Sequence, residues 1–229
     1  GLTNLGLIIL ILTLIIKISL SPLTYKSYLS QAKMKVLKPE IDKINEKHKA
    51  KDPMKAQQET MGLYRKAGVN PMGGCLPMLV QFPILIAMFR FFPASMELRQ
   101  NAFLWADDLS AFDSIYDLGF NIPMYGDHIS LFTLLMTIST LMYTHMNSQM
   151  TSNQMPGMKW MMYLMPIMFL GFFNNYASAL SYYYFLANIF TFSQMYFMRR
   201  FVDEDSILSQ LEENKKKPKK KSKFQKKLE

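Results

Sequence analysis

The chain has 229 residues, of which 50% are apolar and 14% aromatic, and it carries 26 Lys and Arg against 17 Asp and Glu. One Cys and modest Gly and Pro contents exclude a disulfide-stapled secreted scaffold and a collagen-like fibre, and the apolar fraction excludes a disordered polymer. Because the mean hydropathy of +0.03 is ordinary, the distribution of the apolar residues must decide the class of protein.

Apolar residues gather in blocks that are separated by charged segments. The first block has Lys17 as its only charge, and a helix of about 20 apolar residues crosses a hydrocarbon core about 30 Å thick. The last two blocks run together, and turn-forming residues at 173–178 predict a short connection between them. The sequence therefore predicts an all-α, polytopic membrane protein with transmembrane helices at about 2–21, 72–92, 128–147, 158–173 and 178–198.

Lys and Arg are distributed unevenly between these spans. Eleven lie within 22–71 and eleven follow Met198, whereas the stretch from Arg90 to His128 holds two beside six Asp and Glu. Since positively charged loops stay in the cytoplasm, we expect this chain to begin outside and to end in the cytoplasm. It opens on Gly rather than Met, so we also expect further sequence upstream.

The segments between the spans have distinct compositions. Residues 23–68 are Lys-rich and helical in composition, which predicts a cytoplasmic hairpin of two helices, either a solvated spacer or a docking surface. The outward loop, residues 93–127, holds aromatic rings that suit a membrane interface, and we expect it to be a structural cap. These rings belong to Phe103, Trp105, Phe112 and Tyr116.

The basic cytoplasmic tail, residues 199–229, is too polar to bury a core and is predicted to be disordered. Its Lys run can bind anionic lipid, but dense Lys runs also bind phosphate backbones such as that of ribosomal RNA. The candidate ribosome-binding residues are Lys215, Lys216, Lys217, Lys219, Lys220 and Lys221.

Polar side chains interrupt the predicted spans at few places. Lys17 lies near the cytoplasmic end of the first span, where its long stem can snorkel toward water. Thr13 lies one turn earlier on the same face, which favours a polar partner or a wet groove instead. Gln81 in the second span, and Tyr184 and Asn188 in the last, add polar groups that can converge with Lys17 on one amphiphilic cavity.

The sequence lacks motifs that are typical of catalytic sites. It has no glycine-rich phosphate loop and no GxSxG, and the three His lack metal-ligand spacing. No carboxylate within the predicted spans offers a proton relay. We therefore predict neither an enzyme nor a cofactor or metal site.

The run Asn-Pro-Met-Gly-Gly-Cys-Leu-Pro-Met-Leu-Val-Gln-Phe-Pro-Ile at 70–84 resembles the signature that opens the second core helix of the YidC/Oxa/Alb membrane protein insertases. Further resemblances lie in order along the chain, at 17–28, 32–34, 96–100 and 178–188. They extend over essentially the whole sequence. The chain is thus identified as similar to the conserved C-terminal core of a bacterial member.

The resemblance implies a five-helix core, residues 1–198, around a cationic groove open to the cytoplasm. The groove cation of the family, usually Arg, falls on Lys17, which keeps the charge but lacks the planar fork that binds carboxylates. The substrate-contacting hydroxyls fall on Thr13 and Tyr184. The hairpin corresponds to the region for substrate capture, where the candidate residues are Lys33, Lys35, Lys55 and Arg65.

The function implied is that of an insertase and membrane chaperone in the bacterial inner membrane. Its partners would be nascent membrane proteins, the lipid bilayer, the Sec translocon and, through the basic tail, the ribosome. The resemblance also implies an anchor helix and a large periplasmic domain upstream. A solute transporter or channel is a second interpretation, although the two halves show no repeat. A scaffold that recruits ribosomes or Sec partners without inserting clients is a third.

Overall fold

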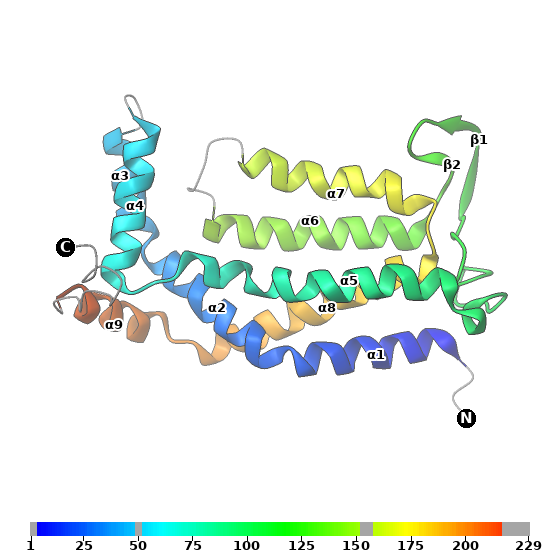
Figure 1. The fold of residues 1–229 in the computed structure, drawn as a ribbon, viewed down its shortest axis with the longest axis horizontal. Coiled ribbons are helices and arrows are strands. Elements are labelled where there is room, and N and C mark those ends of the chain that lie inside the picture. Colours follow the sequence, from blue (N-terminus) through cyan, green and yellow to red (C-terminus); the bar gives the residue numbers. More distant parts are fainter. Residues whose placement is uncertain (1–3, 49–51, 152–157, 217–229) are drawn as a thin grey trace, which may run out of the picture.

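The computed structural model describes residues 4–48, 52–151 and 158–216. Figure 1 shows helices running along the long axis of the molecule, with further helices at one end and the strands β1 and β2 at the other. The helices along this axis are α1 (Leu5–Ser19), α5 (Leu76–Ala94), α6 (Leu131–Thr151), α7 (Met158–Asn174) and α8 (Ser178–Phe201). The elements at one end are α3 (Lys38–His48), α4 (Pro53–Ala67) and α9 (Glu204–Lys216). Between α1 and α3 the chain forms α2 (Ser21–Val36).

The first helix begins at a side-chain cap and ends at a bend. Asn4 Oδ1 accepts a hydrogen bond from the backbone N–H of Leu7 at 3.2 Å, which satisfies one of the free donors at the start of α1. After Leu20 the chain turns by 58° into α2, whose first turn contains Pro22. The fixed backbone of Pro suits the start of a helix but not its interior, so the bend falls at this position.

A bilayer crossing needs a helix of about 20 mostly apolar residues. Within the described residues no single helix is both long and apolar enough, whereas α1 and α2 taken together as a bent pair are. Shorter apolar stretches lie within α5 and α7, at Leu79–Ala94 and Trp160–Asn174. The five-span topology stays a prediction.

Several helix bounds differ from those of the predicted spans. The turn η1 (Pro71–Cys75) precedes α5, which therefore begins at Leu76 rather than at residue 72. Residues 126–129 form a strand, so α6 begins at Leu131 rather than at 128. Between α7 and α8 the helices are interrupted after Asn174 and resume at Ser178, where the sequence predicts the turn.

The chain is mostly helical, but the prediction of an all-α fold missed a β-hairpin. In the outward loop, after the turn η2 (Met96–Leu98), β1 (Tyr116–Ile122) pairs antiparallel with β2 (Gly126–Ile129). Tyr116 lies opposite Ile129, and Gly119 and Gly126 adopt left-handed φ values of 74° and 112°. The strands are short and mix apolar with acidic residues, so their alternation does not stand out in the sequence.

The segment 23–68 forms three helices rather than the predicted two. The break between α2 and α3 falls at Leu37, whose side chain is fully buried. The loop that follows leads into α4, where Asp52 caps the N-terminus and Pro53 occupies the first turn. α4 ends at Gly68, with a φ of 71°. We call α2, α3 and α4 together the helical hairpin.

The prediction of a disordered tail is wrong for its first part. α8 continues to Phe201, and α9 follows after a short break. Ile207 and Leu211 of α9 are 4% and 1% exposed, because they pack into an apolar cluster of the helical hairpin. The sequence shows only a polar segment, since the apolar surface that covers these two residues lies about 150 positions earlier in the chain.

The main core surrounds the first turns of α8. Side chains with no exposed area here belong to Ala179, Leu180, Ser181 and Tyr183. Residues of α1, α5, α6, α7 and the outward loop also belong to this cluster. Phe103 and Trp105 are partly buried and pack against it, whereas Phe112 and Tyr116 are 48% and 64% exposed. The helix that carries Tyr184 and Asn188, two of the predicted groove residues, is therefore also the centre of the fold.

Alanine substitutions of two glycines near the end of α4 are expected to have opposite effects on stability. A Cβ on Gly62 meets nothing within 4 Å, so Gly62→Ala should raise the free energy of unfolding by about 0.8–1 kcal/mol through helix propensity. Gly68→Ala should lower it by about 1–2 kcal/mol, because φ is left-handed there. Thermal unfolding of the purified chain measures both, and equal midpoints for the two variants would contradict the assignment of the cap.

Candidate functional site

Lys17 joins α1 to α8 through two hydrogen bonds. Its half-buried ammonium donates to Thr191 Oγ1 at 3.0 Å, and its backbone carbonyl accepts from Gln194 Nε2 at 3.0 Å. No carboxylate of the described residues pairs with this ammonium. The positive charge therefore lies between two mostly apolar helices with only a neutral partner.

The surroundings of Lys17 contain hydrogen-bond acceptors that are not fully used. Thr191 Oγ1 donates to the carbonyl of Ala187 at 2.7 Å, so its hydrogen is already used and only its lone pairs face Lys17. Gln194 Oε1 is buried and has no hydrogen-bond partner in the described part of the chain. A buried acceptor of this kind is costly unless a donor reaches it. The α1–α8 contact can thus offer a cation and an acceptor to a polar group that enters.

Gln81 of α5 contacts α8 at Tyr183, which is not among the predicted site residues. Gln81 Nε2 donates to the hydroxyl of Tyr183 at 3.1 Å, and Tyr183 is fully buried. Tyr184 is half-buried and packs edge-on against Tyr183, with ring centroids 5.4 Å apart. The sequence contains both tyrosines side by side, but nothing in their spacing tells which one faces α5.

Asn188 connects α8 to α6. Its Nδ2 donates to Ser139 Oγ and to Thr140 Oγ1, both at 2.9 Å. Ser139 was not among the predicted residues. Both amide hydrogens of Asn188 are thereby used within the bundle, which gives this residue a packing role in the structure.

Thr13 does not present a hydroxyl to a groove. The residue has no exposed area, and Oγ1 donates to the carbonyl of Ile9 in its own helix at 2.7 Å. Threonine in helices commonly bonds back in this way. The predicted set is therefore only partly brought together: Lys17 of α1 and Gln81 of α5 each contact α8, whereas Asn188 of α8 contacts α6.

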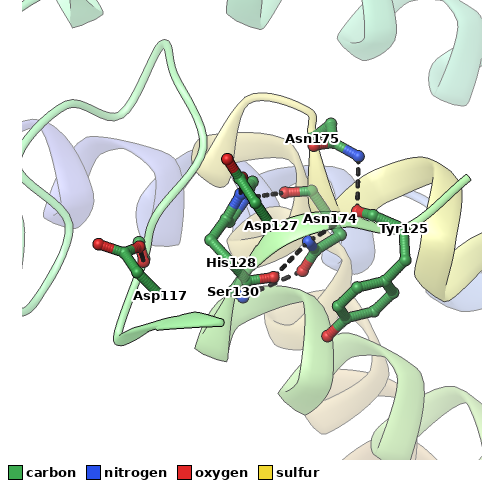
Figure 2. A network of polar contacts seen from close by, with 8 residues as sticks. Asp117, Tyr125, Asp127, His128, Ser130, Asn174 and Asn175 are labelled. Carbon is green, nitrogen blue, oxygen red and sulfur yellow. Dashed lines mark hydrogen bonds and ion pairs between the residues drawn. The ribbon is translucent and has the colours of Figure 1, made fainter. Parts of the chain in front are cut away.

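A second polar network lies beside the β-hairpin, where α7 ends (Figure 2). Asn174 is fully buried; its Nδ2 donates to the carbonyls of Tyr125 and His128, and its Oδ1 accepts from Ser130 N. His128 Nε2 lies 2.9 Å from the Asn174 carbonyl and Nδ1 lies 3.1 Å from Asp127 Oδ1. This bond from His128 holds the pKa of Asp127 below its usual range.

The buried carboxylate of Asp113 extends this network to the start of α6. It accepts from the backbone N–H groups of Leu131 and Phe132 at 2.9 and 3.1 Å. It also accepts from Ser130 Oγ at 2.5 Å and from Trp105 Nε1 at 2.9 Å. Asp113 is thus an N-terminal cap supplied from a distant loop, and it ties the β-hairpin end of the bundle together.

The predicted capture residues occupy varied positions on the helical hairpin. Lys33 and Lys35 are half-buried on α2, and Arg65 is exposed on α4. Lys55 forms an ion pair with Asp52, 3.2 Å apart, and its bond lowers the pKa of the Asp52 carboxyl. These four side chains therefore differ in exposure and in the contacts they make.

Of the predicted ribosome-binding residues, the structure describes the contacts of Lys215 alone. Its ammonium pairs with Glu40 Oε1 of α3 at 2.5 Å. Nothing is described of the side chain of Lys216, and Lys217, Lys219, Lys220 and Lys221 lie outside the described residues. Lys215 is therefore engaged within the chain, beside the helical hairpin.

Residues 1–205 match the family described as 60Kd inner membrane protein. The chain belongs to this family. Over 234 residues it is 54% identical to the membrane protein insertase YidC of Parabacteroides distasonis. The match covers 99% of this chain and 37% of that protein. The resemblance found in the sequence is confirmed.

Further curated relatives carry the same name. The membrane protein insertase YidC of Bacteroides fragilis is 52% identical over 233 residues, and that of Porphyromonas gingivalis is 49% identical over 237 residues. Each match covers 99% of this chain but 38% of the relative. The chain thus spans less than two fifths of the length of the curated relatives it matches.

Proposed function

We propose that the chain forms the membrane core of an insertase and chaperone. It captures hydrophobic client proteins in a cationic, hydrophilic groove open to the cytoplasm and releases them into the bilayer. The observation that carries the proposal is Lys17, whose charge lies between α1 and α8 with Thr191 as a neutral partner. The names of the relatives support the same class of activity.

The chemistry of such a groove follows from the cost of moving polar groups through hydrocarbon. A client's polar tail loses water as it crosses, and each unsatisfied backbone group costs several kcal/mol. A groove that reaches partway across the bilayer shortens the dry distance. The ammonium of Lys17 attracts acidic residues of the entering tail, and the apolar span of the client then leaves for lipid with a gain of about 25 cal/mol per Å².

The remaining assignments are proposals on the same basis. The chain resides in the bacterial inner membrane with its N-terminal end outside and its C-terminal end in the cytoplasm. The helical hairpin receives nascent membrane proteins, and the basic tail approaches the ribosome. The protein acts alone or beside the Sec translocon. The Lys and Arg distribution between the apolar blocks supports this orientation.

Autonomous insertion tests the proposal. The purified chain is reconstituted into liposomes, and protease protection measures insertion of a single-span client with a short acidic N-terminal tail. We expect insertion well above that of empty liposomes and of liposomes that hold an unrelated polytopic protein. If the folded chain gives no more insertion than these controls, the scaffold interpretation replaces the proposal.

A further inference from the structure

α9 occupies an apolar groove on the helical hairpin. Its buried side chains, Ile207 and Leu211, join a cluster that α2, α3 and α4 supply. The hairpin side of this cluster consists of Ala32, Met34, Leu37, Ile41, Tyr64, Ala67 and Val69. The hairpin therefore presents a groove of the kind that binds the apolar face of an amphipathic helix.

Polar contacts fix the far end of α9 in the groove. The ammonium of Lys215 pairs with Glu40 Oε1, and the two side chains are 25% and 43% exposed. Asn214 Nδ2 lies 3.5 Å from the carbonyl of Ala67, among the last carbonyls of α4 that have no partner within the helix. Glu40 of the hairpin thus lies beside Lys215, at the basic end of α9.

The residues of α9 that contact the hairpin form one stripe. Ile207, Leu211 and Lys215 are spaced at i, i+4 and i+8, so they lie on one face of the helix. Leu208, one position from Ile207, is 40% exposed and lies off this stripe. The groove therefore selects an apolar, apolar, basic order along a single helix face.

We propose that this groove is a docking site for the cytoplasmic end of a client's membrane helix, and that α9 is its resident occupant. The proposal rests on the insertase function proposed above. A spanning helix is apolar and is flanked by Lys or Arg on its cytoplasmic side, so its end carries the same stripe as α9. Glu40 supplies the charge that matches this flank. Docking of a client displaces α9 from the hairpin.

An occupant on the same chain lowers the apparent affinity of a competitor. A tethered helix competes at an effective concentration of the order of millimolar, and the apparent Kd rises in inverse proportion to the fraction of open groove. If α9 occupies the groove about nine tenths of the time, its removal tightens binding of an added helix about tenfold.

The test measures binding of a fluorescent peptide to the full chain in nanodiscs. The peptide has an unrelated amphipathic sequence with leucines at the positions of Ile207 and Leu211 and a lysine at that of Lys215. We expect Leu211→Glu, which breaks the apolar face of α9, to tighten binding about tenfold. Leu208→Glu is the matched control, because it places the same charge on the exposed face, and it should leave binding unchanged. Equal affinities for the two variants would overturn the proposal.

Charge reversal gives a second arm that leaves the apolar cluster intact. Lys215→Glu should also tighten binding, since it repels Glu40 and loosens α9, whereas a peptide with Glu in place of its lysine should bind weakly. Glu40→Lys should reverse this preference between the two peptides. Hydrogen exchange of α2 and α4 checks that the hairpin stays folded in each variant.

Binding that ignores both charge changes would refute the docking site. Client insertion by the unaltered chain, measured in liposomes, is a separate readout. The docking proposal can therefore fail while the insertase function stands.

Discussion

Lys17→Glu is expected to lower insertion of a client with an acidic tail at least tenfold. At an effective dielectric constant of about 20, two unit charges about 4 Å apart interact by about 4 kcal/mol, and the substitution turns attraction into repulsion. Each 1.4 kcal/mol corresponds to about a factor of ten. Even after strong screening by water in the groove, the change exceeds one decade. Protease protection of the client in proteoliposomes measures it.

A charge series separates this electrostatic effect from damage to the fold. Lys17→Arg should insert normally, and Lys17→Ala should be impaired. Lys17→Glu should recover activity for a client whose tail carries lysines instead of acids. Lys26→Glu is the matched control, because Lys26 is an exposed lysine on α2. Equal insertion by Lys17→Glu and Lys26→Glu would remove the capture step from the mechanism.

Asp113→Ala is expected to lower the free energy of unfolding by about 3 kcal/mol. The carboxylate is 2% exposed and accepts four hydrogen bonds, including two from the first N–H groups of α6. Each buried donor left without a partner costs about 1–3 kcal/mol, and loss of a cap costs about 0.5–2 kcal/mol. Thermal unfolding should show a fall in the midpoint of about 6–12 °C.

Two further variants test the cause of this loss. Asp113→Asn keeps one acceptor oxygen and should lose about half as much stability. Asp117→Ala removes an acidic residue from the same loop, but Asp117 is exposed and its described side-chain bond is with Ser114 Oγ at 2.7 Å. It should change stability by less than about 0.5 kcal/mol. Similar losses for Asp113→Ala and Asp117→Ala would contradict the network.

The sequence by itself determined the family and most of the helical architecture. The apolar blocks are 16 to 20 residues long and contain few turn signals, which indicates helices. The run at 70–84 is specific to one family. Lys17 was visible for the same local reason, since a lone charge in an apolar block stands out regardless of the fold.

Only the tertiary structure decided which polar groups meet. Helical spacing places residues on a face, but it does not tell which neighbour that face contacts. Gln81 therefore donates to Tyr183, which was not a predicted site residue, and Thr13 bonds within its own helix. Asp113 lies in a loop, and its role as a cap of α6 depends on a contact across 18 positions of sequence.

The tail shows most clearly the difference between what the sequence determines and what only the tertiary structure decides. In the sequence, Ile207 and Leu211 are two apolar residues in a polar segment, which on composition alone cannot bury a core. In the structure they pack into an apolar groove formed by residues 32–69. The stability of α9 comes from surface supplied by another part of the chain, because short helices owe their stability to tertiary packing rather than to local propensity.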